Sequence, residues 1–197
     1  MSKYMRAVLI GVVVGFLVAF GLGALYAATG IRGSNMPTLS GLGAFAITTY
    51  LLANLAGNRS GPSATADQRA KALAAQPPAG KALLYLYREG FVAKLAGMNV
   101  SIDGRVVAQL KSPRFTCITV APGTHRIAAG LGGLAGPQNK SSELSVEIAP
   151  DSVVALRMTM QMGMLQGSVA IAPQTDLAPV LRTLAGMTMI SPDIAEI

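Results

Sequence analysis

The chain has 197 residues, of which 51% are hydrophobic and only 13% are charged. This composition is too apolar for an ordinary soluble domain and indicates membrane-spanning segments. The formal charge of +7 is spread thinly along the chain. It therefore indicates membrane flanks and a surface facing anionic lipid headgroups and does not favour a nucleic-acid partner. One cysteine excludes an intrachain disulfide, and one histidine excludes a site built on two imidazoles.

Residues 7–28 form an apolar stretch without a charged side chain. As a helix rising about 1.5 Å per residue, the stretch would span roughly 33 Å, enough to cross the hydrocarbon core of a bilayer. Four small residues recur at every fourth position: Gly11, Gly15, Ala19 and Gly23. Such a face lets another helix approach closely, so we expect helix packing along it.

Residues 37–56 form a second stretch without formal charge. Pro37 suits its first helical turn, where a missing amide hydrogen costs nothing. Ser40, Ala44 and Thr48 provide a small-residue face here as well. The link between the stretches, TGIRGSNM, is short and rich in turn-forming residues. Residues 1–56 are therefore predicted to form a transmembrane helical hairpin.

An alternative interpretation treats the first stretch as a signal peptide, because basic residues precede it and small residues lie near its end. The stretch is longer than a usual signal core and a second one follows at once, which favours two spans. Arg32 is the basic residue of the link, whereas five basic residues flank the outer ends: Lys3, Arg6, Arg59, Arg69 and Lys71. Positive charge marks the cytoplasmic side, so we expect both ends of the chain there, with the periplasm as the alternative for the second domain.

Residues 57–80 form a predicted linker. Its first part, GNRSGPSA, is typical of a flexible segment, whereas TADQRAKALAAQ predicts a short helix that ends before Pro77 and Pro78. Thr65 and Gln68 have the spacing of a capping box, in which each side chain satisfies an amide at the helix start. A solvated spacer is the alternative.

From residue 81 onward, short apolar runs alternate with turn signals, as in all-β domains. KALLYLYRE is apolar on both faces and predicts a central strand, whereas NVSIDGRVVAQL predicts a hairpin at Asp103–Gly104, a pair that adopts the positive φ angles of a tight turn. Pro122–Gly123 and Pro150–Asp151 predict further turns. GLGGLAGPQNKSS predicts a flexible loop, MLQGSVAIA a last strand, and Asp176 the N-cap of a short closing helix. About seven strands predict an antiparallel sandwich over residues 81–197.

Part of this region carries a recognisable pattern: Tyr-x-Tyr-Arg, a variable loop, a strand ending in Asp-Gly, a second strand and Pro-Gly-x-His. The matching residues are Tyr85, Tyr87, Arg88, Asp103, Gly104, Pro122, Gly123 and His125. In this pattern, residues 80–185 resemble a bacterial domain-of-unknown-function family found in small lipoproteins and membrane-anchored proteins, and also the shorter PEGA-type β modules. The resemblance implies an Ig-like or PEGA-like β-sandwich and brings no established catalytic residue. The lipobox cysteine of the lipoprotein form is missing here.

The stretch RMTMQMGM, residues 157–164, places methionine at every second position. Polar or small residues lie between the methionines, so the period of two predicts the inward face of a β-strand. Thioethers also suit copper(I). Neighbours on one face of a strand stand about 7 Å apart, however, which is too far for consecutive residues to share one ion. The pattern favours a packed core, with copper as the alternative.

Four polar side chains form a candidate interaction surface: Tyr85, Tyr87, Arg88 and His125. The two tyrosines would either stack on a ligand or pack against a loop, and Arg88 would make a surface ion pair with Glu89. His125 is expected to be a hydrogen-bonded structural residue. Cys117 lies in the strand-like run FTCITV and is expected to be a small buried hydrophobe.

No nucleophile elbow, phosphate-binding loop or histidine–cysteine metal motif is found in the sequence, and we expect no catalytic, cofactor-binding or metal-binding residue. The sequence predicts a non-enzymatic accessory or scaffolding protein of the bacterial inner membrane. Its expected partners are the lipid bilayer and either another membrane protein or further copies of the same chain. The alternative is a periplasmic module that binds a metal, a glycan or a peptide.

Overall fold

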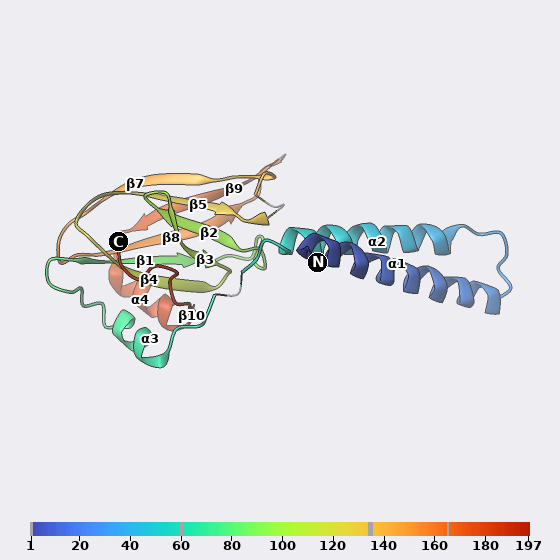
Figure 1. Ribbon diagram of the computed structural model, residues 1–197, viewed down its shortest axis with the longest axis horizontal. Coiled ribbons are helices and arrows are strands. Elements are labelled where there is room, and N and C mark those ends of the chain that lie inside the picture. The colour runs from blue at the N-terminus through green and yellow to red at the C-terminus, as the bar shows by residue number, and fades with distance from the viewer. Residues whose placement is uncertain (1, 60, 134–135, 165) are drawn as a thin grey trace. The chain divides into compact units, whose positions relative to one another are not determined.

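A computed structural model describes residues 2–59, 61–133, 136–164 and 166–197 (Figure 1). The chain divides into two compact units, Met1–Gly57 and Asn58–Ile197. Leu134 and Ala135 of the predicted flexible loop, and Leu165 of the predicted last strand, lie outside the described residues.

The first unit consists of two helices, α1 (Lys3–Ala28) and α2 (Met36–Leu55), which pack against each other (Figure 1). α1 begins at Lys3 rather than at residue 7, because Ser2 Oγ accepts a hydrogen bond from the Met5 amide at 3.2 Å and caps the helix. Pro37 lies in the first turn of α2, as predicted. The predicted hairpin of two apolar helices is therefore present.

Both helices are long and apolar enough to cross a membrane by length and composition. Only 11% of the most apolar window of α1, and 6% of that of α2, is buried in the structure. The core helix of a soluble protein is buried over most of its length. Here the buried positions are small instead: Ala7, Gly11, Gly15, Gly41 and Ala53.

The second unit contains two β-sheets and two short helices among its described residues (Figure 1). The first sheet has the strand order β10-β4-β1-β8-β9-β6. Its strands are β1 (Ala82–Arg88), β4 (Arg114–Val120), β6 (Asn139–Lys140), β8 (Val153–Gln161), β9 (Gly167–Gln174) and β10 (Thr188–Met189). The second sheet has the order β3-β2-β5-β7. Its strands are β2 (Met98–Ile102), β3 (Arg105–Leu110), β5 (Gly123–Leu131) and β7 (Ser142–Ile148).

Most strand pairs are antiparallel, which confirms the predicted topology in part. The pairs β1–β8, β4–β10 and β6–β9 are parallel. The turn at Pro150–Asp151 leads from β7 in one sheet to β8 in the other. Because the chain passes through the second sheet between β1 and β8, β8 can return beside β1 in the same direction.

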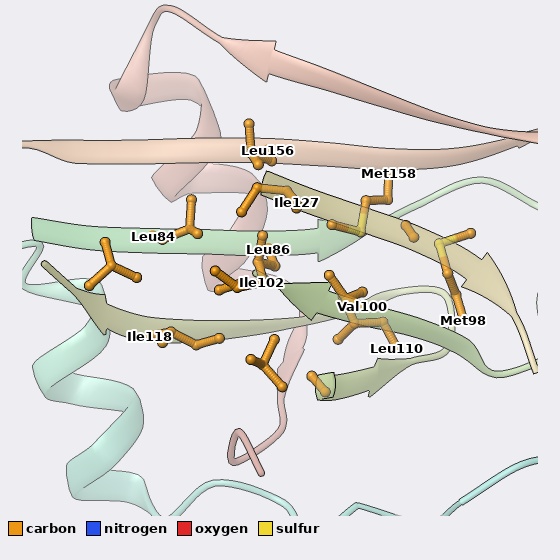
Figure 2. Close-up of a cluster of buried hydrophobic side chains, with 14 of the residues drawn as sticks. Leu84, Leu86, Met98, Val100, Ile102, Leu110, Ile118, Ile127, Leu156 and Met158 are labelled. Atoms are coloured by element: carbon orange, nitrogen blue, oxygen red, sulfur yellow. The ribbon is translucent and has the colours of Figure 1, made fainter. Parts of the chain in front are cut away.

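Side chains from both sheets form one hydrophobic core (Figure 2). Leu84 and Leu86 of β1 and Leu156 of β8 are fully buried, as are Val100 of β2 and Ile127 of β5. Figure 2 shows these side chains directed into the space between the strands. Burying one such side chain stabilises a fold by about 1.5–3 kcal/mol, so this core holds the two sheets together.

β1 is buried along its whole length and lies between β4 and β8, as its apolar pattern predicts. Alternate side chains of a strand point to opposite faces, and the face of β1 away from the main core carries Leu83, Tyr85 and Tyr87. These residues pack with side chains of two helices, α3 (Ala66–Leu73) and α4 (Leu177–Ala185).

The capping interactions predicted for α3 and α4 are present. Thr65 Oγ1 accepts a hydrogen bond from the Gln68 amide, and the Gln68 side chain accepts one from the Thr65 amide at 2.9 Å. Asp176 Oδ1 accepts one from the Ala178 amide at 3.1 Å. The short strand β10, which follows α4, has no counterpart in the sequence prediction.

Candidate functional sites

Three of the four predicted packing residues of α1 lie against α2: Gly11, Gly15 and Ala19. A Cβ atom added at Gly15 would lie 2.7 Å from the Gly41 carbonyl oxygen, and one added at Gly41 would lie 2.6 Å from the Cβ of Ala19. A Cβ atom at Gly11 would collide with Thr49 Oγ1. The glycines therefore let the two backbones approach closely, and the nearest partner of this face is the second helix of the same chain.

Gly23 continues the spacing but has no such contact. A Cβ atom added there would meet no other atom within 4 Å. The close approach of α1 to α2 therefore runs from Gly11 to Ala19 and does not extend to Gly23.

An apolar groove of about 370 Å³ lies along the hairpin. It is lined by the small residues Gly15, Ala19 and Gly41 and by the larger side chains of Phe16 and Leu42. Small residues of both helices therefore meet in the lining of this groove.

The interpretation of Tyr85 and Tyr87 as surface residues is wrong, because their exposed fractions are 0% and 3%. Tyr85 donates a hydrogen bond from its hydroxyl to the Ala72 carbonyl of α3. Burial raises the pKa of Tyr85, and the neighbouring Cys117 adds to this effect. Burial also raises the pKa of Tyr87. Both rings are packing residues beneath α3 and α4.

Arg88 is also buried rather than exposed. Its guanidinium donates hydrogen bonds to three backbone carbonyls: that of Ala93 at 2.7 Å, that of Leu110 at 3.0 Å, and that of Ala96. Burial lowers the pKa of Arg88 to about 10, so the side chain remains cationic at neutral pH. Arg88 thus ties the β1–β2 loop to the end of β3. Glu89, its predicted partner, pairs instead with Arg157 at 3.2 Å.

The predicted turn at Asp103–Gly104 is present between β2 and β3, with φ angles of 50° and 80°. Asp103 Oδ1 accepts a hydrogen bond from the Arg126 amide at 2.8 Å. This bond, together with a hydrogen bond from His125, lowers the pKa of Asp103. Gly123, which follows Pro122 and begins β5, has φ 135°, a conformation that favours glycine.

His125 bridges this turn and the start of β5 and is buried rather than part of a binding surface. Its Nδ1 lies 2.7 Å from Asp103 Oδ2, and its Nε2 lies 2.8 Å from the Ala121 carbonyl oxygen. Both partners only accept hydrogen bonds, so the site suits an imidazole protonated on both nitrogens. Burial alone would lower the pKa of His125, but the bonds to Asp103 and Ala121 outweigh burial and raise it.

Cys117 faces Tyr85 across the β1–β4 pair. Burial raises the pKa of its thiol to about 12, so almost no nucleophilic thiolate exists at neutral pH. Cys117 also lines a cleft of about 500 Å³, together with Leu83, Met189, Gln68 and Lys71. Sequence reasoning missed this cleft, because its walls come from α3, the first sheet and the C-terminal segment.

The methionine repeat is split by the end of β8. Met158 is fully buried in the main core and Met160 packs against it. β8 ends at Gln161, and Met162 and Met164 are exposed beyond it. The prediction of an inward face is therefore confirmed for the first two methionines and wrong for the last two.

Within the described residues, no group of three or more histidine, cysteine, aspartate or glutamate side chains could hold a metal ion. No protein-family model matches this chain, and no curated protein matches it. The resemblance to PEGA-type modules therefore stays a prediction.

Proposed function

We propose that this chain is a non-enzymatic accessory or scaffolding protein of the bacterial inner membrane. Its helical hairpin spans the bilayer, and its second unit is a PEGA-like β-sandwich that serves as an interaction module. The outward exposure of the large apolar side chains of α1 and α2 carries this proposal. Examples are Val13, Phe16 and Phe20 of α1 and Leu39 and Ile47 of α2.

Lipid explains this exposure better than water does. Removing one such side chain from water gains about 1.5–3 kcal/mol, so a hairpin that presents many of them to water would be strongly disfavoured. The spans also satisfy their backbone amides and carbonyls internally, as helices in a bilayer must.

The groove along the hairpin supports docking onto another membrane helix. Its lining is apolar and includes the small residues Gly15, Ala19 and Gly41 beside the larger side chains of Phe16 and Leu42. The occupant is a helix of another membrane protein or of a second copy of this chain. More basic residues flank the outer ends of the hairpin than lie in the link between its helices. This charge bias supports a cytoplasmic β unit.

Blocking the groove tests this function. Leu42 lines the groove and Ile47 does not, although both side chains are well exposed on α2. The wild-type chain and the matched control Ile47→Trp should co-purify in mild detergent with a stoichiometric membrane partner or as a homo-oligomer, and Leu42→Trp should lose that partner. An isolated wild-type monomer, or an unchanged complex in Leu42→Trp, would contradict the proposal.

A second candidate function is binding of a small ligand in the cleft beside Cys117. Leu83 and Met189 supply apolar lining and Lys71 a cation, which suits a short apolar chain with an acidic head. Octanoate is a suitable probe in calorimetric titrations of the full chain. Ala74→Trp, at the cleft and directly after α3, should abolish the binding heat, whereas Ala70→Trp, on α3 but outside the cleft, should retain it. No heat with the wild-type chain would end this candidate.

A further inference from the structure

Four of the five exposed large apolar side chains among the described residues of the second unit gather at one end of its sheets. Five such residues are exposed among the described residues of this unit: Phe91, Leu95, Val106, Met162 and Met164. All except Val106 belong to the β1–β2 and β8–β9 loops. Phe91 is 87% exposed and Met162 82%, so neither contributes to the core.

The two loops lie at the same end because β1 and β8 are neighbours and run parallel. Arg88, the last residue of β1, is in register with Met158, and the Glu89 amide donates a hydrogen bond to the Met158 carbonyl at 3.3 Å. The chain leaves β1 and β8 in the same direction. We call residues 89–97, 111–113, 139–140 and the described residues of 162–166 the rim.

The rim also carries a surplus of positive charge. Its basic residues are Lys94, Lys111 and Lys140. Lys111 follows Leu110, which pairs with Met98, and Lys140 pairs with Ser168 beside Gln161, so both belong to the same end as Lys94. Glu89 is the acidic residue of the rim, and Arg157 already neutralises it.

Hydrogen bonds fasten the β1–β2 loop to Asn58, the first residue of the second unit. Asn58 donates a side-chain hydrogen bond to the Leu95 carbonyl at 2.7 Å and accepts one from the Gly97 amide at 2.6 Å. Leu55, the last residue of α2, precedes Asn58 by three residues in the sequence.

We propose that the rim is a bilayer-contact surface: Phe91, Leu95, Met162 and Met164 insert among lipid chains, and the three lysines contact anionic headgroups. Apolar side chains next to cations are typical of surfaces that lie in a membrane interface. The inference rests on the proposed membrane location of the hairpin. It makes the second unit a membrane-lying module rather than a freely tethered one.

Depth measurements with single-cysteine variants of the full chain test the inference. In a Cys117→Ala background, Phe91→Cys and Met164→Cys carry a fluorescent label, and the protein is reconstituted into phosphatidylglycerol vesicles that contain a nitroxide-quencher lipid. Ala149→Cys is the matched control, because Ala149 is exposed at the opposite end of β7 and β8. Val13→Cys, in the middle of α1, reports whether the hairpin itself is inserted.

The inference predicts that the labels at positions 91 and 164 are quenched nearly as strongly as the label at 13, whereas the label at 149 is not. Replacing phosphatidylglycerol by phosphatidylcholine should weaken quenching at 91 and 164 and leave it unchanged at 13. Quenching at 13 with none at 91 and 164 would overturn the rim assignment and leave the hairpin proposal intact. Protection of 91 and 164 from aqueous iodide without lipid quenching would assign the rim to a protein contact and also overturn it. No quenching at 13 would refute the membrane proposal itself.

Discussion

The two units of this chain use apolar side chains in opposite ways. The hairpin buries glycine and alanine between its helices and exposes residues such as Phe16 and Phe20. The β unit buries Leu84 and Leu156 between its sheets. A core of large side chains is stable where water surrounds it, whereas a seam of small residues is stable where lipid surrounds it. This difference supports the proposal that lipid surrounds the hairpin.

The largest change in stability should come from replacing Arg88, whose buried guanidinium donates hydrogen bonds to three carbonyls of the β unit. Arg88→Met keeps a long side chain but leaves these acceptors without their donor, so we expect the free energy of unfolding to fall by about 3–5 kcal/mol. Urea unfolding followed by near-ultraviolet circular dichroism measures this change. The control Arg126→Met removes an exposed arginine and should change stability by less than about 0.5 kcal/mol. Equal effects would show that Arg88 carries no special structural role.

Truncating one leucine in each unit tests whether large apolar side chains stabilise only the β unit. Leu156→Ala should destabilise the β unit by about 2–5 kcal/mol, because it leaves a cavity in the core. Leu17 is 60% exposed on α1, so Leu17→Ala should leave the packing of the hairpin unchanged. Unfolding curves in nanodiscs measure both variants, and a large loss from Leu17→Ala would reveal that its side chain is buried.

A glycine substitution tests the seam of the hairpin. Gly15→Ala places a methyl group against the Gly41 carbonyl. Relieving this overlap should lower the stability of the hairpin by about 1–3 kcal/mol. Gly21→Ala is the control, because a Cβ atom there meets nothing within 4 Å. Spin labels on the exposed residues Leu9 and Ile47 should report a longer interhelical distance for Gly15→Ala alone. The same distance in both variants would contradict close packing at Gly15.

The smallest effect should come from pH. Because the pKa of His125 is raised in the folded state, the hydrogen bonds of His125 stabilise the β unit fully below the unfolded pKa of about 6.5. This contribution is lost as the pH rises through the raised pKa of the folded state. Asp103, whose pKa is lowered in the folded state, contributes stability above about pH 4. This contribution is lost as the pH falls through the lowered pKa. Stability from this pair should therefore peak between roughly pH 4 and 6.5.

His125→Gln should flatten the alkaline side of that profile, which thermal melts across a pH series can measure. The effect is small because Asp103 is partly exposed and solvent screens its charge. An unchanged alkaline slope in His125→Gln would assign the pH dependence to another group.

Features determined by the local sequence were predictable. The Asp103–Gly104 turn, the Thr65 capping box and the central position of β1 each depend on residues close together in the chain. Short-range steric and hydrogen-bonding rules therefore suffice for them.

Features that depend on distant partners were not predictable. Arg88 looks exposed in sequence because its acceptors are backbone carbonyls, which no side-chain pattern reveals. Met162 and Met164 continue the period of two although β8 has already ended at Gln161. The cleft beside Cys117 combines segments far apart in sequence, so only the folded chain brings its walls together.

Membrane fractionation tests whether the helical hairpin spans a bilayer. Membranes from cells that express the full-length chain are washed with alkaline carbonate and centrifuged at high speed, and the mass of the protein is then determined. We expect an uncleaved chain that stays in the pellet and dissolves only in detergent. Full-length protein in the detergent-free supernatant, or a mature chain that lacks the first helix, would contradict it.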